Sequence, residues 1–243
     1  MNLIRREVFK IKTYETDFNN AVKVSSIFNY MQEAASNNAQ ELHFGYDELV
    51  KNNLYWVLSR ALLVMKEYPK FSDEIVIETW PSGIEKFFAF RDFKIFNSQN
   101  KLIGYAITMW LLMDANRKKP VKPDEYFKDI KFPELAHVTK EVPKKIVEPE
   151  LKEYITKKKV LYSDIDVNQH VNNVKYIEYA FDGFELERIR YSKARRVQIN
   201  FLNETKYNEE LSIYRSKLSE NIFYLDGVKS DGEFAFQMIV ELG

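Results

Sequence analysis

The chain has 243 residues, 15% of them aromatic, and its 36 Lys and Arg residues balance its 36 Asp and Glu residues. That length suits one large domain or two of about 120 residues, and the neutral balance gives no general attraction to nucleic acid or to a membrane surface. The lack of cysteine excludes disulfides, thiolate metal sites and a cysteine nucleophile. We expect a cytoplasmic protein, because no uncharged stretch approaches the roughly 20 residues of a membrane helix.

The first half of the chain predicts a strand, a helix and four more strands. Residues 1–12 read as a charged strand rather than as a signal peptide. Apolar residues at helical spacing from Ile27 to Leu42 predict a helix, with Ser25 or Ser26 as its cap. β-branched and aromatic residues with partial alternation then predict strands at Leu54–Lys66, Glu74–Trp80, Phe87–Phe96 and Leu102–Met113.

A proline-rich segment predicts a connection between two domains. Five of the seven prolines fall in one window, at Pro120, Pro123, Pro133, Pro143 and Pro149. Prolines at this density block regular structure. We therefore expect an N-terminal domain at 1–114, a partly structured linker at 115–153 and a C-terminal domain at 154–243.

The second half repeats the order of the first. A helix is predicted from Val174 to Phe184, with Asn172 or Asn173 near its cap. The strands predicted after it are Arg195–Asn203, Glu210–Leu218, Phe223–Val228 and Glu233–Leu242. A helix followed by antiparallel strands, twice over, implies an α+β architecture.

Short matches between the halves indicate a duplication. Asp17 and Asn19 precede the first helix as Asp166 and Asn168 precede the second, and both pairs are 149 positions apart (17 to 166, 19 to 168). Asp73–Ile77 matches Glu209–Ile213 at a spacing of 136 positions (73 to 209). Two matches in the same order favour an internal repeat.

The segment Asp166–Asn173 is the most informative in the chain. It carries Asp166, Asn168 and His170 at alternate positions, and His170 is one of only three histidines. In an extended segment, alternation puts these three side chains on one side. A helix start follows directly, and its free N–H groups would help to polarise a carbonyl.

The segment Tyr162–Tyr176 and several shorter ones together resemble one known family. The shorter segments are Asn53–Arg60, Tyr68–Asp73, Glu78–Trp80, Arg91–Asp92 and Trp110–Met113. The family is that of the acyl-acyl-carrier-protein (acyl-ACP) thioesterases, and the resemblance covers nearly the whole chain. It implies two tandem hotdog domains, each a long helix wrapped by a curved antiparallel sheet.

The resemblance also implies an active site of Asp166, Asn168, His170 and a fourth residue, Glu204. Some relatives carry a cysteine after that glutamate, where this chain has Thr205. We expect water to attack the thioester of a fatty acyl-ACP, with Glu204 or His170 as the base, and we favour Glu204 assisted by His170. Asn168 would donate to the carbonyl or orient water, and Asp166 would orient His170 or Asn168.

The duplication predicts a single active site per chain. Ala21 stands in place of His170 and Tyr68 in place of Glu204, and neither side chain is a useful base near neutral pH. Catalysis is therefore expected in the C-terminal half, which leaves the N-terminal half to bind the acyl chain.

Further residues are candidates for binding the acyl chain or the carrier protein. Trp56 and Trp80 would line an acyl tunnel or pack in the core. Lys193, Arg195 and Arg196 would dock the acidic carrier protein. His43 and His137 are expected to be surface or structural residues.

We expect acylated carrier protein as the partner, neither nucleic acid nor membrane, and a homodimer is possible. The phosphopantetheine arm arrives with the substrate, so no metal or diffusible cofactor is expected. The alternatives are an acyl-CoA thioesterase, a non-catalytic acyl or carrier-binding module and, with a poorer motif match, a dehydratase of hotdog type. These expectations place the chain in fatty acid biosynthesis and lipid metabolism.

Overall fold

The computed structural model describes residues 3–127 and 137–243. The chain divides into two compact units, Met1–Pro143 and Lys144–Gly243. Each unit combines one principal helix with an antiparallel sheet, in agreement with the α+β prediction. Among the described residues, no helix is long and apolar enough to cross a membrane.

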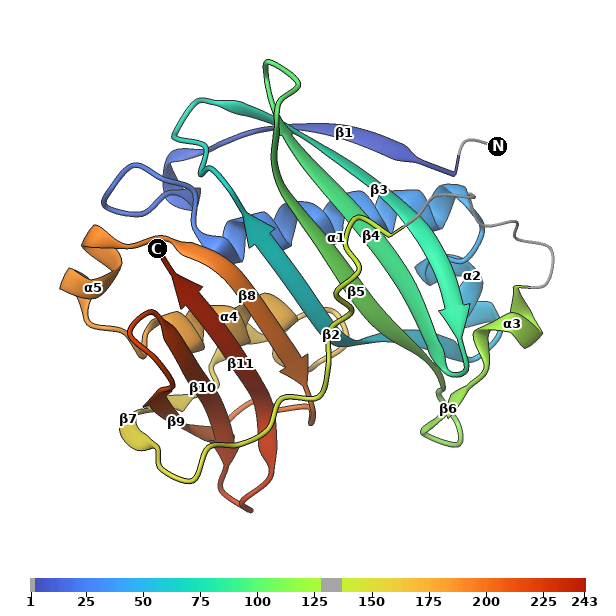
Figure 1. Cartoon of the computed structure of the whole chain (residues 1–243). Helices are drawn as coiled ribbons and strands as arrows, with labels where there is room; N and C mark the ends of the chain where they lie inside the picture. Colours follow the sequence, from blue (N-terminus) through green and yellow to red (C-terminus); the bar gives the residue numbers. More distant parts are fainter. Residues whose placement is uncertain (1–2, 128–136) are drawn as a thin grey trace. The chain divides into compact units, whose positions relative to one another are not determined.

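In the N-terminal unit, the helix α1 (Val24–Glu41) lies along one face of a sheet (Figure 1). The strands are β1 (Arg5–Lys10), β2 (Leu54–Met65), β3 (Glu74–Glu85), β4 (Phe88–Asn97), β5 (Leu102–Asp114) and β6 (Lys119–Val121). Their order across the sheet is β1-β3-β4-β5-β2, with β6 paired to β5. Two short helices, α2 (Tyr46–Lys51) and α3 (Pro123–Tyr126), follow α1 and β6.

The core of this unit lies between α1 and the sheet. Ile27, Met31 and Ala34 recur at helical spacing and are all buried on α1, which packs against β3. On β3 the buried residues Ile75 and Ile77 alternate with more exposed ones. The two periodicities recognised in the sequence therefore correspond to the faces that these elements bury.

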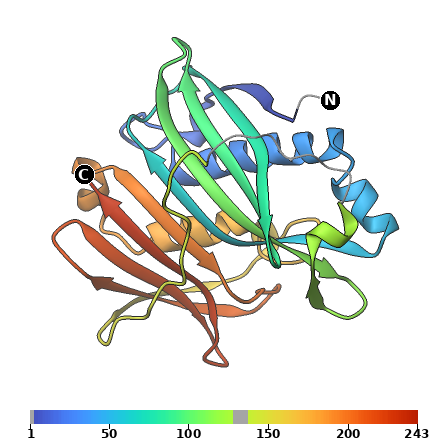
Figure 2. The ribbon, with the colours of Figure 1, turned by 45° about the vertical axis from the view of Figure 1, so that its right-hand side comes forward.

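The C-terminal unit repeats this arrangement with a shorter helix. Its principal helix, α4 (Asn173–Phe181), packs against β10, and Figure 2 shows it lying against one face of the sheet. The strands are β7 (Glu153–Lys159), β8 (Ala194–Phe201), β9 (Glu210–Lys217), β10 (Ile222–Lys229) and β11 (Phe234–Leu242). Their order is β8-β11-β10-β9-β7, and the short helix α5 (Leu186–Tyr191) precedes β8.

The predicted cap of α1 is wrong. The helix begins at Val24, after Lys23, and the first turn already contains Ser25 and Ser26. The hydroxyl of Ser26 instead donates to the backbone oxygen of Glu15, 3.0 Å away. The backbone N–H of Lys23 donates to the same oxygen. These two bonds fix the entry of the chain into α1 without a side-chain cap.

The expected linker is divided between the two units. Strand β6 pairs with β5 and so belongs to the N-terminal unit. From Lys144 on, the segment packs on the C-terminal sheet, where the Gln198 amide donates to the Lys144 oxygen at 2.8 Å. Lys152 Nζ lies 2.6 Å from the buried carboxylate of Asp226. Residues 128–136, which include Pro133, lie outside the described residues.

Candidate active site

The segment expected to be extended at Asp166–His170 is a tight turn. The N–H of Asp166 donates to the oxygen of His170 at 2.9 Å, and the N–H of Gln169 donates to the oxygen of Asp166 at 3.0 Å. Asp166 Oδ1 accepts the N–H of Asn168 at 2.8 Å, and Gln169 adopts a positive φ of 65°. The side chains of Asp166, Asn168 and His170 are therefore not arranged by the alternation of an extended segment. An Asp side chain that accepts the backbone N–H two residues ahead closes a turn instead.

The turn brings His170 to Glu204. Glu204 lies in the loop after β8, and its Oε2 is 3.1 Å from Nε2 of His170. The two segments are joined by a backbone hydrogen bond of 2.9 Å from the N–H of Val171 to the oxygen of Thr205. The side chains are 30% and 50% exposed, respectively, so a substrate and a water molecule can both reach this imidazole–carboxylate pair.

The other two predicted residues contribute differently. The Asp166 carboxylate holds the turn through the Asn168 N–H, so it positions Asn168 through the backbone. The Asn168 side chain is exposed on the turn. Within the part of the chain that the structure describes, no hydrogen bond joins its carboxamide to His170 or Glu204. Asn168 thus adjoins the pair along the chain without a hydrogen bond to either side chain among the described residues.

The helix start offers fewer free donors than expected. Asn172 is the N-cap of α4, and its Oδ1 accepts the N–H of Val174 at 2.9 Å. The backbone oxygen of Asn172 accepts the N–H of Lys175 at 2.9 Å. The predicted cap is therefore confirmed at Asn172. The same cap engages two of the N–H groups that we expected to be free for an oxyanion.

The N-terminal unit contains the same turn without the titratable pair. The N–H of Asp17 donates to the oxygen of Ala21, and Asp17 Oδ1 accepts the N–H of Asn19 at 2.8 Å. The N–H of Val22 donates to the oxygen of Pro69 at 2.9 Å, as Val171 does to Thr205. These bonds confirm the spacings of 149 and 136 positions. They also put Tyr68 in the place of Glu204, and burial raises the pKa of Tyr68 above its usual value.

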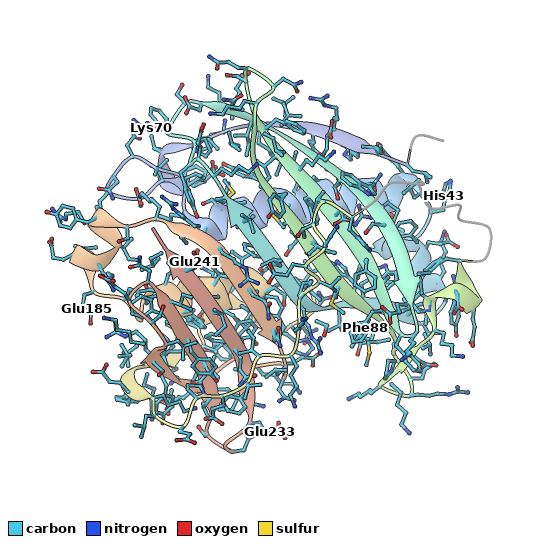
Figure 3. The ribbon with its side chains drawn as sticks, in the orientation of Figure 1. His43, Lys70, Phe88, Glu185, Glu233 and Glu241 are labelled. Carbon is cyan, nitrogen blue, oxygen red and sulfur yellow. The ribbon has the colours of Figure 1, made fainter. Side chains whose placement is uncertain are left out.

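The basic cluster is separated from the site within the C-terminal unit. Arg196 pairs with Glu241 near the end of β11, and Asn203, next to Glu204, donates to the Phe234 oxygen at the start of β11. Figure 3 marks these two ends of β11 by the labelled residues Glu241 and Glu233. Arg196 and Phe201 are five positions apart along β8, which corresponds to roughly 16 Å of strand. Lys193 and Arg195 adjoin Arg196, so the cluster does not border the His170–Glu204 pair.

Both predicted tryptophans take part in the packing of the N-terminal unit. Trp80 on β3 is only 2% exposed, and the ammonium of Lys94 lies 5.5 Å from the centre of its ring. Trp56 on β2 is half-buried, donates to the oxygen of Phe44 and stacks on Phe127. Core packing accounts for Trp80, whereas a tunnel role for Trp56 stays a prediction.

Two side-chain contacts were not anticipated from the sequence. Nδ1 of His137 lies 2.7 Å from Oδ2 of the buried Asp92, which makes His137 a structural residue, as expected, but with a buried carboxyl group as its partner. Near the site, the hydroxyl of Tyr176 accepts the N–H of Thr205 at 3.1 Å. The sequence offered one sign of this second contact: Tyr176 stands where the N-terminal half has Ile27, 149 positions earlier.

Comparisons with known proteins match nearly the whole chain. Residues 2–130 match the acyl-ACP thioesterase N-terminal domain, and residues 147–239 match the acyl-ACP thioesterase C-terminal domain. A chloroplastic palmitoyl-acyl carrier protein thioesterase of Gossypium hirsutum is 27% identical over 253 residues, covering 99% of this chain and 60% of that protein. The chain therefore spans about three fifths of the length of that relative.

Two solved structures are similar over their full length. An acyl-ACP thioesterase from Bacteroides thetaiotaomicron is 27% identical with a TM-score of 0.86, and the match covers 99% of this chain and 98% of that one. The 12:0-ACP thioesterase from Umbellularia californica is 21% identical with a TM-score of 0.89, covering 100% and 98%. These likenesses confirm the fold of two tandem hotdog units.

Proposed function

The chain belongs to the acyl-ACP thioesterase family, and on that premise we propose that it hydrolyses a fatty acyl-ACP to free fatty acid and holo-carrier protein. The observation that carries the proposal is the 3.1 Å contact between His170 Nε2 and Glu204 Oε2. A thioester is an activated acyl group, so its hydrolysis needs a positioned water, a base and a donor for the developing oxyanion.

In the proposed reaction, Glu204 acts as the base. Its carboxylate takes a proton from water as the water oxygen bonds to the thioester carbonyl carbon. The carbon–sulfur bond then breaks, and His170 delivers a proton to the departing thiolate of the carrier. The short contact between the two side chains allows the proton to pass from Glu204 to His170 between these steps.

The remaining residues would position the reactants. Asn168 extends an exposed carboxamide from the same turn, and we assign it the donor role toward the thioester carbonyl oxygen. Asp166 would act by holding the turn. As proposed, the reaction uses no metal or diffusible cofactor, because the phosphopantetheine arm belongs to the substrate.

The two halves would divide binding and catalysis. Ala21 and Tyr68 replace the catalytic pair in the N-terminal unit, so we assign hydrolysis to the C-terminal unit and the acyl chain to the N-terminal one. Lys193, Arg195 and Arg196 remain candidates for docking the acidic carrier, at a distance from the scissile bond that the substrate's arm would have to span. The cytoplasmic location and the homodimer stay predictions.

The test compares variants on paired substrates. His170→Ala and Glu204→Gln are each expected to lower kcat at least 100-fold on an acyl-carrier thioester, measured by release of the carrier thiol. His43→Asn is the matched control, because His43 is an exposed histidine of the N-terminal unit, labelled in Figure 3, with a φ of 61° that asparagine tolerates. Its kcat should equal that of the unmutated protein.

The same assay separates the alternatives. A strong preference for acyl-CoA over the matched acyl-carrier substrate would point to an acyl-CoA thioesterase. Equal rates for His170→Ala, Glu204→Gln and the unmutated protein would instead indicate a non-catalytic acyl or carrier-binding protein.

A further inference from the structure

We propose that Tyr176 is a positioning residue that holds Glu204 against His170 through the Thr205 peptide. The inference rests on the proposed function, because it assigns a role within the same site. It concerns a side chain on α4 that contacts neither His170 nor Glu204 by hydrogen bond but binds the residue that follows Glu204.

The Thr205 peptide is held from two sides. Its N–H donates to the Tyr176 hydroxyl at 3.1 Å, and its oxygen accepts the N–H of Val171 at 2.9 Å. Val171 directly follows His170, and Thr205 directly follows Glu204. The first bond ties the glutamate loop to α4, and the second ties it to the histidine turn. Together they determine where the carboxylate of Glu204 stands relative to the imidazole.

The Tyr176 side chain is itself rigidly placed. It is only 3% exposed, and its ring centre lies 5.5 Å from that of Phe236 and 6.1 Å from that of Phe201. Burial raises the pKa of Tyr176 more than its hydrogen bonds with Thr205 lower it, leaving a value of about 12. The hydroxyl is therefore neutral near pH 7, which suits a fixed hydrogen-bond acceptor and not a proton carrier.

Comparison with the N-terminal unit indicates that the bond between Tyr176 and Thr205 serves the catalytic pair and is not needed to fold the turn. There the bond from Val22 to the Pro69 oxygen keeps the same length of 2.9 Å. Pro69 stands in place of Thr205 and has no N–H to donate. Ile27 stands in place of Tyr176 and has no hydroxyl to accept. Donor and acceptor are thus missing together in the copy that also lacks the histidine and the glutamate, and its turn still forms.

The first experiment is a double-mutant cycle on the full chain. Tyr176→Phe keeps the ring and removes the acceptor. It should lower kcat about tenfold with KM changed less than twofold, since displaced catalytic groups affect the chemical step more than binding. In a Glu204→Gln background, the same substitution should lower the residual kcat less than twofold, because it acts through Glu204.

A matched control separates positioning from general destabilisation. Tyr224→Phe also removes a buried hydroxyl, which bonds to Asp226 at 2.8 Å and to Gln237 at 2.9 Å on the sheet of the same unit. Its kcat should remain within twofold of the unmutated value. Thr205→Pro is a second variant, which copies the N-terminal sequence, removes the donor and leaves the hydroxyl. It should reproduce the kcat loss of Tyr176→Phe.

Several results would overturn the inference. One is a folded Tyr176→Phe protein whose kcat stays within twofold of the unmutated value. Another is an equal fractional loss with and without Glu204, which would mark Tyr176 as merely structural. If Tyr176→Phe does not fold, retention of full kcat by Thr205→Pro would decide against the inference. Failure of the proposed function has a different signature, namely full activity of Glu204→Gln itself.

Discussion

The role of Asp166 can be tested by separating its charge from its ability to accept a hydrogen bond. Asp166 Oδ1 accepts the N–H of Asn168 at 2.8 Å and closes the turn that carries His170. Asp166→Asn keeps an oxygen at that position, and asparagine is favoured in such turns. Asp166→Ala removes the acceptor. If the turn is what matters, the asparagine variant should retain kcat within about threefold, whereas the alanine variant should lose about 10- to 100-fold as His170 moves.

The stability cost can be estimated from the same hydrogen bond. A net contribution of about 1 kcal/mol for this bond would lower the melting temperature of a chain of this size by about 2–4 °C. Asp17→Ala is the matched control, because Asp17 Oδ1 accepts the N–H groups of Asn19 and Ala21 at 2.8 and 3.1 Å in the first copy. It should lower the melting temperature by at least as much and leave kcat unchanged.

The two assays together can refute this reasoning. Thermal unfolding and release of the carrier thiol are measured on all three variants. A loss of activity in Asp166→Asn as large as that in Asp166→Ala would show that the negative charge acts in the reaction. The Asp166 carboxylate would then take part in the reaction as well as close the turn.

Two further predictions concern stability. Lys152→Met leaves the buried Asp226 without its cation, 2.6 Å away, and should cost about 3–5 kcal/mol at pH 7. Burial already raises the pKa of Asp226 more than Lys152 and Tyr224 lower it. The group therefore stabilises the fold below the unfolded-state pKa of about 3.9 and loses this effect as pH rises. The loss of stability in Lys152→Met, measured by thermal unfolding, should accordingly shrink toward pH 4, and a loss that grew toward pH 4 would contradict this reasoning. Asn172→Ala removes the cap of α4 and should cost about 1 kcal/mol by denaturant unfolding, and an unchanged midpoint would show that the cap is dispensable.

Many of the strands were predictable because the β-branched and aromatic residues that favour a strand lie within its own sequence. The strand predicted at Leu102–Met113 is found at Leu102–Asp114, and the one at Glu210–Leu218 is found at Glu210–Lys217. The strand β7 was missed because its sequence contains Lys157, Lys158 and Lys159 and has no apolar alternation. It is the last strand of its sheet, where lysines protect the open edge from pairing. Its pattern therefore reflects its place in the sheet, which local periodicity does not reveal.

The closeness of two predicted site residues was predictable, but the geometry of the turn that carries one of them was not. The sequence, with the family resemblance, identified His170 and Glu204, which lie 3.1 Å apart. The turn was missed because its left-handed residue is Gln169 and not a glycine or asparagine. The contact between Tyr176 and Thr205 was missed because it joins a helix to a loop across 29 residues. Such a contact leaves no pattern within either segment.

A comparison of the two halves distinguishes the residues that fold the turn from the residues that we assign to catalysis. Asp17 and Asp166 are of the same residue type, and the Oδ1 of each accepts the backbone N–H two positions ahead. The side chains that differ, Ala21 against His170 and Tyr68 against Glu204, leave the backbone bonds between the segments in place. Because one copy keeps the turn without the pair, the pair is not required for folding. Substitution of Asp17 or Asp166 should therefore alter the stability of the unit that contains it, whereas substitution of His170 or Glu204 should alter catalysis alone.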